Sequence, residues 1–546
     1  MRIGPLIFSL LIICRVSAFA YPDSFPKDDC ENFFKEKNIS SYYYNDHLPY
    51  EVYYKSLSRK NCHKEWTVLV FMAADNDLSP YAYWDIYEME RLISGQKNLG
   101  ATTDRVDVIV ELDTYERNGI NRYHIFQTNK IYDSSVDLDF FSSFNENNID
   151  SPVIKKYLEQ NNTVKDQNIR FERFITQSIR DYPSKHYMVV IWGHGEGYIG
   201  SSYKSKMVID DKTLPPSFSG KYLTPENISV EALNQQYNFE IKQEFPYNKV
   251  FGGVAFDYTD LSFLDIPSIQ QTIKKTLSQL QYEKPVDIIA FDACLMQTLE
   301  VATELSDVTD YIVGSTQIQD YLGLPYRIIL DKLNDKISPF DLAREIPSLV
   351  SRSMEKDGYQ GSISIKNKGT YTTSTLSTQN LKKYFVPSFM DFSQSLIDYI
   401  EEDLFRMLDL KIIFENSPSF KGETRDIGIL LATIEQLLYA EKNNAKETMK
   451  GIHLKNQILK LWDNLNKMVL GNSFGPYYTD SSLSKKDTYF LNYFKGLSVW
   501  VPSNKRLYDH RIEEFRKSAL YTNYKNTNSI SSLEKLLNII YNASKF

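Results

Sequence analysis

The feature that most constrains the fold of this chain is a set of short, near-continuous apolar runs. The four clearest are WTVLVFMAA (66–74), VDVIVEL (106–112), HYMVVIWG (186–193) and VDIIAFDA (286–293). Runs of this kind are typical of strands that are buried on both faces of a sheet. Amphipathic stretches predict helices at 78–92, 171–182, 266–280 and 294–305. The alternation predicts an α/β fold with a mostly parallel sheet and helices on both faces.

The rest of the chain divides around this α/β domain, which we expect to span residues 66–330. Residues 21–65 carry little regular pattern and are predicted to be an N-terminal extension or pro-segment. The polar, lysine-containing stretch at about 201–250 predicts a long surface insertion. Residues 331–546 have a largely helical pattern with one strand at 496–502, and we expect this region to pack on the α/β domain.

The first twenty residues have the pattern of a secretory signal peptide. Arg2 precedes an apolar run at 5–14, and Ala18-Phe19-Ala20 forms a small-residue cleavage site. A membrane anchor is the alternative, but a run of about ten apolar residues is shorter than the ~20 that a bilayer requires. We therefore predict cleavage after residue 20, a secreted or periplasmic location, and no membrane span in the mature chain.

Charge and cysteine content narrow the function further. The formal charge of −8 argues against a nucleic-acid partner, because nucleic-acid-binding domains carry basic patches. Export would place the mature chain in an oxidising compartment, where Cys30 and Cys62 could form a disulfide. That pairing leaves Cys294 as an odd thiol, which is either a buried apolar residue or a reactive group.

Two of the apolar runs end in residues that can perform chemistry. His194 lies between Gly193 and Gly195, and Cys294 follows Asp292 by two positions. Ligands of open α/β sheets bind at the carboxyl ends of the strands, so both side chains are expected at the ligand-binding edge. A thiol at a helix N-terminus, a histidine and the N–H of a glycine would supply a nucleophile, a general base and an oxyanion donor. The pair indicates a Cys/His hydrolase, although a core cysteine and a turn histidine remain the alternative.

The blocks IWGHG and AFDACLMQ, together with FMAADNDL and GLSVWVP, resemble the clostripain-type cysteine peptidases of peptidase family C11. The resemblance extends from about residue 66 to the C-terminus. It implies a caspase-like fold, and a cysteine endopeptidase whose partners are protein or peptide substrates.

The resemblance also implies roles for individual residues. Cys294 matches the nucleophile, His194 the catalytic histidine, and the Gly195 N–H the oxyanion donor. Asp292 matches the acid of the S1 pocket, which selects Arg or Lys at P1, the residue before the scissile bond; a carboxylate there would pair with the cation. The alternative for Asp292 is a cap on a helix beginning at Cys294. Asp75 also follows an apolar run, so its own position predicts that it lines the cleft or caps the helix that follows it.

One departure from the family pattern leaves the P1 preference open, because Gln317 and Gln319 stand where more acidic residues are expected.

Relatives resembling this chain are cut between the histidine and the cysteine. The insertion offers lysines for such a cut, namely Lys204, Lys206, Lys212, Lys221 and Lys242. We therefore predict self-cleavage within about 204–249, with a tolerated surface loop as the alternative.

Other functional classes are weaker or remain open. The seven histidines show neither HExxH nor HxH spacing, which disfavours a metal hydrolase. No cofactor is expected to be required. Calcium stays possible, because some relatives depend on it, but no EF-hand loop is present and the pair Asp210-Asp211 is only suggestive. The main alternative to a peptidase is a catalytically inactive, caspase-like exported binding module.

Overall fold

The computed structural model describes most of the chain from residue 63 onward. The described residues are 63–91, 101–103, 105–114, 119–128, 145–157, 166–199, 207–208, 243–244, 252–257, 259–260, 262–355, 358, 360, 371–419, 423–444, 448–475, 492–524 and 531–542. The signal peptide, the Cys30–Cys62 disulfide and nearly all of the extension and the insertion lie outside these residues. Those expectations therefore stay predictions.

A nine-stranded sheet forms the centre of the described structure, in the order β14-β12-β11-β10-β5-β1-β2-β3-β4. Its strands are β1 (Lys64–Ala74), β2 (Val106–Thr114), β3 (Ile120–His124), β4 (Val153–Tyr157), β5 (Ser184–Trp192), β10 (Val286–Asp292), β11 (Thr309–Gly314), β12 (Thr372–Ser377) and β14 (Val469–Phe474). The central strands from β11 to β2 are parallel, and antiparallel strands extend both edges. The α/β fold with a largely parallel sheet is confirmed.

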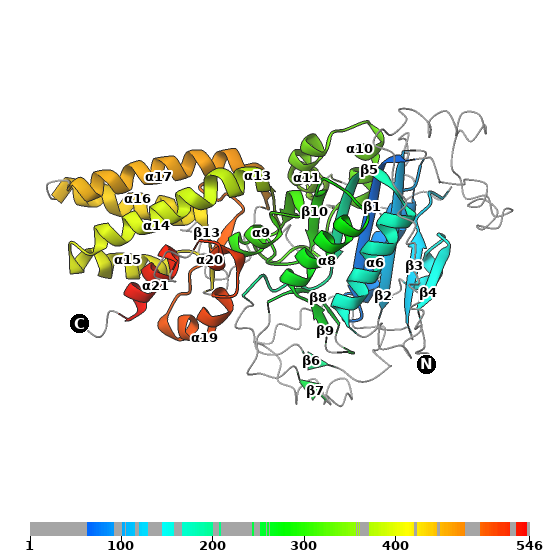
Figure 1. Ribbon diagram of the computed structural model, residues 1–546, viewed down its shortest axis with the longest axis horizontal. Coiled ribbons are helices and arrows are strands. Elements are labelled where there is room, and N and C mark those ends of the chain that lie inside the picture. Colours follow the sequence, from blue (N-terminus) through cyan, green and yellow to red (C-terminus); the bar gives the residue numbers. More distant parts are fainter. Residues whose placement is uncertain are drawn as a thin grey trace, which may run out of the picture.

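Helices cover both faces of this sheet (Figure 1). One face packs against α3 (Ser79–Glu90), α10 (Tyr326–Asn334) and α11 (Pro339–Met354). The other face packs against α6 (Gln167–Asp181), α8 (Ile266–Gln279) and α9 (Leu299–Leu305). Alternate residues of β1 enter the two cores, with Leu69 and Phe71 on the α6 side and Val68 and Val70 on the α3 side. This double burial explains why the strand is apolar at nearly every position.

Short hairpins lie beside the main sheet. β8 (Val254–Asp257) pairs with β9 (Ser262–Leu264), just before α8. β6 (Met207–Val208) pairs with β7 (Gln243–Glu244), within the segment expected to be an insertion. A single 3₁₀ turn, η2 (Glu146–Asn148), precedes β4 among the described residues.

The C-terminal region is largely helical, as expected, and Figure 1 shows its helices gathered at one end of the molecule. Its elements are α13 (Thr378–Asn380), the π-helical turn η4 (Leu381–Phe385), α14 (Val386–Ile400), α15 (Leu404–Asn416), β13 (Thr424–Asp426), α16 (Ile427–Asn444), α17 (Met449–Met468), β15 (Ser498–Trp500), α19 (Lys505–Phe515), α20 (Ala519–Thr522) and α21 (Ser532–Asn542). β13 and β15 pair antiparallel. The same region also supplies β12 and β14 to the main sheet, two strands that the sequence pattern does not predict.

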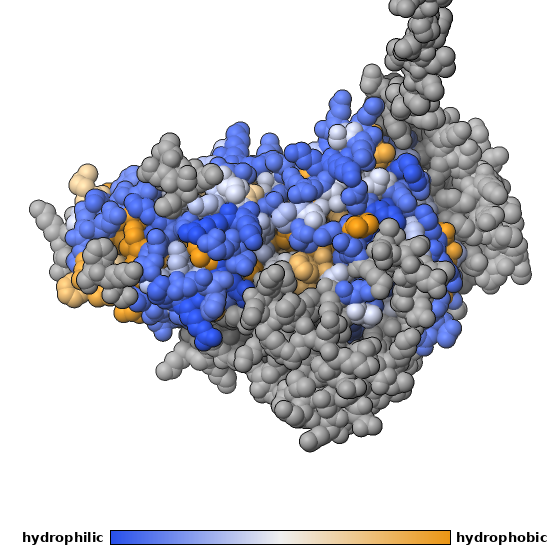
Figure 2. All heavy atoms as spheres, turned by 60° about the horizontal axis from the view of Figure 1, so that its bottom comes forward, coloured by the Kyte–Doolittle hydropathy of each residue, from blue (hydrophilic) through white to orange (hydrophobic). Residues whose placement is uncertain are grey.

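One surface feature of the C-terminal helices is apolar. Figure 2 shows a mostly hydrophilic face with apolar residues gathered near the end of the helical region. Helix α15 has four exposed apolar side chains, those of Leu404, Phe405, Leu408 and Ile412. Even so, none of the helices in the described part of the chain is both long enough and apolar enough to cross a membrane.

Candidate active site

The ends of β5 and β10 bring the two candidate reactive residues to the same edge of the sheet. These strands pair in parallel up to Trp192 and Asp292, and the Gly193 N–H donates to the Asp292 carbonyl at 3.2 Å. His194 and Cys294 each follow the last register pair by two positions. The expectation that both residues meet at the carboxyl end of the sheet agrees with this register.

Gly195 lies directly against the loop that carries the thiol. A Cβ atom on Gly195 would fall 2.2 Å from the Cys294 carbonyl oxygen, which is a steric clash. Only glycine, which has no Cβ, fits at this position. On its other side the loop bonds to the β8 segment through the His194 carbonyl and the Glu196 N–H. Neither of these two bonds uses the Gly195 N–H.

Cys294 does not lie at a helix N-terminus, and this expectation was wrong. Helix α9 begins at Leu299, where the Thr298 hydroxyl caps it by accepting from Val301 N at 3.3 Å. Leu295 adopts a left-handed φ of 64°, so the chain turns sharply immediately after the thiol. The partly buried Cys294 Sγ instead accepts a hydrogen bond from the Gln319 N–H at 3.4 Å. A backbone donor on sulfur stabilises negative charge there in place of the helix dipole.

His194 has a carboxylate partner that the sequence did not reveal. Its Nε2 donates to Asp77 Oδ1 at 2.7 Å, with the Asp77 side chain 54% exposed and that of His194 23% exposed. A carboxylate on one ring nitrogen fixes the tautomer and orients the other nitrogen. The two residues are 117 positions apart, so no local pattern could have identified the contact.

The neighbouring Asp75, expected to cap the next helix or to line the cleft, does not cap α3. It accepts from the Thr259 hydroxyl at 2.8 Å. Helix α3 begins after Leu78 without a side-chain cap, while Asn76 Oδ1 accepts from the Leu78 N–H at 2.9 Å. The acid that reaches His194 is therefore Asp77, two positions further along.

Asp292 is buried at 6% exposure beneath the Cys294 turn. Its Oδ1 accepts from Gln319 Nε2 at 2.5 Å, and its Oδ2 accepts from the Leu324 N–H at 3.1 Å and the Tyr326 hydroxyl at 2.8 Å. The alternative of a helix cap is wrong, because α9 begins seven residues later. Burial raises the pKa of Asp292 to about 6, and the three hydrogen bonds oppose that rise.

Gly323 closes over this carboxylate. With φ of 55°, it lies so close that a Cβ atom would fall 2.5 Å from Asp292 Oδ2. Beneath the site, Asp85 Oδ2 accepts from Trp192 Nε1 at 2.7 Å. Burial, and then the proximity of Asp292 and Glu88, raises the pKa of Asp85 well above its usual value.

The side chains gathered at this site are a thiol, an imidazole and several carboxylates. Within the described ranges, no group of three or more His, Cys, Asp or Glu side chains is arranged to hold a metal ion.

Comparison with known proteins places the chain in a family. The model described as the Clostripain family matches residues 70–214 and 242–387, which together make up more than half of the chain. His194 lies in the first matched segment and Cys294 in the second. The break at 215–241 falls within the stretch predicted to be an insertion.

Solved structures give weaker similarities. An X-ray structure of a secreted C11 cysteine protease from Bacteroides thetaiotaomicron, "iotapain", is 16% identical and covers 84% of this chain and 98% of its own, with a TM-score of 0.47. An inactive zymogen C11 protease from Parabacteroides distasonis is 16% identical, covers 86% and 99%, and has a TM-score of 0.46. No curated protein matches. The family match over both halves of the site shows that the chain belongs to the clostripain family of cysteine peptidases.

Proposed function

We propose that this peptidase is an exported endopeptidase that cleaves after Arg or Lys, with Cys294 as nucleophile and His194 as general acid and base. The observation that carries the proposal is the double contact of Gln319. Its N–H donates to Cys294 Sγ at 3.4 Å, and its Nε2 donates to Asp292 Oδ1 at 2.5 Å. Gln319 therefore spans the distance between the thiol and the buried carboxylate. A P1 side chain would have to span the same distance to reach Asp292 from a scissile bond at Cys294.

The chemistry would proceed by acyl transfer. The Cys294 thiolate attacks the carbonyl carbon of the scissile bond, and the Gly195 N–H stabilises the oxyanion that forms. His194 then gives a proton to the leaving amine, which yields the acyl-enzyme. In the second half, His194 takes a proton from water, the water oxygen attacks the acyl group, and the thiolate leaves. The Asp77 carboxylate would hold the imidazole in position through both halves.

Recognition of P1 would rest on Asp292. A buried carboxylate with a raised pKa is only partly compensated by its three neutral donors. A guanidinium or ammonium group would supply the missing positive charge, beside or in place of the Gln319 amide on Oδ1. A neutral or acidic P1 side chain would leave that charge uncompensated.

Export and self-processing belong to the same proposal. The sequence patterns that support them are the leader at 1–20 and the lysine-bearing insertion. A cut between His194 and Cys294 would leave β5 on one product and β10 on the other, and their parallel pairing would hold the products together. Incubating the purified protein beside its Cys294→Ala variant, and reading new N-termini by mass spectrometry, tests this. New termini after lysine in the wild type alone are expected; a fully active, uncut chain contradicts the processing step.

Hydrolysis of fluorogenic peptides tests the activity itself. We expect the wild type to cleave Arg and Lys substrates and to leave a matched Asp substrate intact. Cys294→Ala and His194→Ala should each lose nearly all turnover while keeping the folded circular dichroism spectrum. Unchanged turnover in either folded variant would remove the catalytic assignment, and an inactive wild type with an unreactive thiol would favour the inactive binding module.

A further inference from the structure

The carboxylate of Asp292 is almost fully occupied by donors of the protein itself. Its Oδ2 accepts from the Leu324 N–H at 3.1 Å and from the Tyr326 hydroxyl at 2.8 Å, and its Oδ1 accepts from Gln319 Nε2 at 2.5 Å. An ionised carboxylate accepts about four hydrogen bonds, or about two on each oxygen. Oδ2 is therefore filled, and Oδ1 has room for one more donor.

The two donors on Oδ2 are fixed in the protein interior. Leu324 and Tyr326 are buried and belong to the core on the α3 and α10 face of the sheet. Gly323 lies against both carboxylate oxygens, because a Cβ atom there would fall 2.5 Å from Oδ2 and 2.6 Å from Oδ1. A P1 cation would therefore have to approach Asp292 at Oδ1, beside Gln319.

Gln319 belongs to a loop that is held on both sides of it. Before it, the Gln317 carbonyl accepts from the Leu295 N–H at 3.0 Å. After it, the Tyr321 ring stacks on that of Tyr81, with the ring centroids 4.8 Å apart. The backbone at Gln319 is thus held in place, and its partly exposed side chain covers a buried carboxylate.

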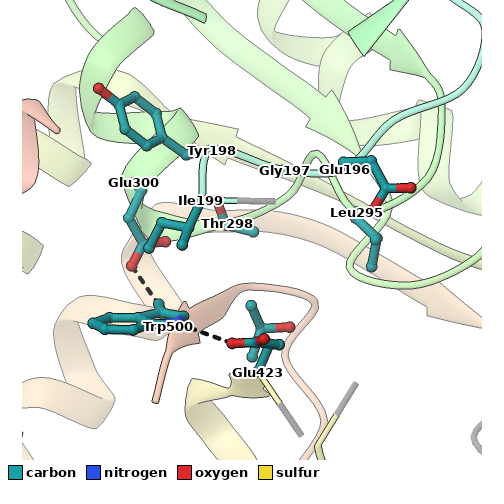
Figure 3. Close-up of a pocket in the computed structure, with 10 residues that line it drawn as sticks. Glu196, Gly197, Tyr198, Ile199, Leu295, Thr298, Glu300, Glu423 and Trp500 are labelled. Carbon is teal, nitrogen blue, oxygen red and sulfur yellow. Dashed lines mark hydrogen bonds between the residues drawn. The ribbon is translucent and has the colours of Figure 1, made fainter. Parts of the chain in front are cut away.

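A second acidic hollow, between the loop after β10 and strand β15, is too small for a P1 side chain. Its volume is about 20 Å³, which is room for about one water molecule. Figure 3 shows its carboxylates bonded to Trp500, whose N–H donates to Glu300 Oε1 at 3.0 Å and whose Nε1 donates to Glu423 Oε2 at 3.2 Å. The cation of a basic P1 residue would therefore bind at Asp292 and not in this hollow.

The two basic side chains use a carboxylate differently. A guanidinium is a planar fork whose advantage comes from two parallel N–H bonds, one to each oxygen. An ammonium is a compact point charge that needs one acceptor oxygen and can leave its other donors to water. With Oδ2 filled and one place left on Oδ1, Asp292 suits an ammonium and denies a guanidinium its second bond.

We propose that Gln319 sets the P1 preference of this peptidase in favour of Lys over Arg, by keeping its amide on Asp292 Oδ1 while the substrate is bound. The inference rests on the proposed function, because it needs a basic P1 side chain at Asp292. It deepens that function by naming the preferred side chain. It also gives a role to Gln319, one of the two positions at which the sequence departs from the family pattern.

Two fluorogenic peptides that differ only in Lys or Arg at P1 test this role. For the wild type we expect kcat/KM to be at least about fivefold higher with Lys, a part of the roughly tenfold or more that one charge-assisted hydrogen bond is worth. In Gln319→Ala a guanidinium can donate twice to Oδ1, so the ratio should fall to about one or below. Gln319→Met keeps the length of the side chain but has no N–H to donate, and it should lower the ratio in the same way. Because the readout is a ratio within one variant, a general loss of activity cancels.

Gln394→Ala is the matched control. Gln394 is a partly exposed residue of α14 whose Nε2 donates to Asp398 Oδ1 at 2.8 Å, so the variant removes the same kind of bond elsewhere and should keep the wild-type ratio. If both peptides are cleaved but the wild type does not prefer Lys, or the preference survives in either Gln319 variant, the role of Gln319 is overturned and the proposed function stands. If neither peptide is cleaved, the proposed function fails and this inference with it.

Discussion

His194 donates its Nε2–H to Asp77 Oδ1 at 2.7 Å. The contact joins the loop after β5 to the loop after β1, its neighbour in the sheet. Because the carboxylate holds Nε2, we propose that Nδ1 is the ring nitrogen that transfers the proton at Cys294. Asp77 would then be a positioning residue of the proposed Cys/His pair.

Asp77→Ala should lower kcat/KM by roughly ten- to a hundredfold, a part of what an oriented general acid and base contributes. Asp77→Asn keeps an acceptor for Nε2–H and should recover part of the loss, with an altered pH profile. Asp75→Asn is the matched control, because Asp75 bonds Thr259 rather than His194. Equal activity in Asp77→Ala and the wild type would remove Asp77 from the mechanism.

Asp292→Asn should lower kcat/KM for Arg and Lys substrates. The loss of transition-state stabilisation should be about 2 kcal/mol or more, the cost of truncating one partner of a buried charge pair. Alkylation of Cys294 by iodoacetamide should change by less than about threefold, because a small neutral reagent needs no P1 pocket. Measuring both rates on the same preparation separates recognition from nucleophilicity. A loss of the two together would mean that Asp292 supports the thiol loop instead.

The pH profile provides a separate check on Asp292. Its pKa is raised to about 6, so the carboxylate is ionised above that pH and neutral below it. Only the ionised form attracts a cation, and kcat/KM for Arg substrates should therefore fall by about tenfold per pH unit on the acid side of 6. In Asp292→Asn this acid limb should vanish from the remaining activity. An unchanged limb in the variant would assign it to another group.

Gly195→Ala should abolish turnover and destabilise the fold, because the new Cβ would lie 2.2 Å from the Cys294 carbonyl oxygen. Gly451→Ala, within helix α17, is the matched control. The nearest atom to a Cβ there is 3.5 Å away, and replacing a helical glycine by alanine gains about 0.5–1 kcal/mol. Thermal melts of both variants measure the two changes in stability, and a peptide-hydrolysis assay measures the turnover of Gly195→Ala. A Gly195→Ala protein with normal activity would show that the two loops are not packed as described.

The sheet could be predicted from the sequence because its central strands are buried on both faces and are therefore apolar throughout. β12 could not, since its sequence TTSTLS is polar. Its hydroxyls are satisfied by the surrounding backbone: Thr375 Oγ1 donates to the Ala343 carbonyl at 2.6 Å, and Ser374 Oγ donates to that of Gly496. Such long-range hydrogen bonds make a polar strand compatible with burial. A local sequence pattern does not predict them.

The candidate site could be predicted in part for a similar reason. Strand ends place His194 and Cys294, and their positions follow from the register of β5 and β10. The sequence pattern predicts a helix from residue 294, whereas α9 begins at Leu299, five residues later. Thr298 as N-cap and Glu300 in the first turn are a helix-start signal that could have located this boundary. The partners of His194 and Asp292, namely Asp77, Gln319 and Tyr326, come from distant segments and are known only from the folded chain.

The most direct test of the central claim is labelling by an arginyl chloromethylketone, followed by peptide mapping with mass spectrometry. We expect one adduct, on Cys294, which forms faster than with an aspartyl chloromethylketone of the same length and more slowly in Asp292→Asn. Cys294→Ser should take no label. Adducts on Cys30 or Cys62 instead, or equal rates for the two reagents, would contradict the assignment of Cys294 and Asp292.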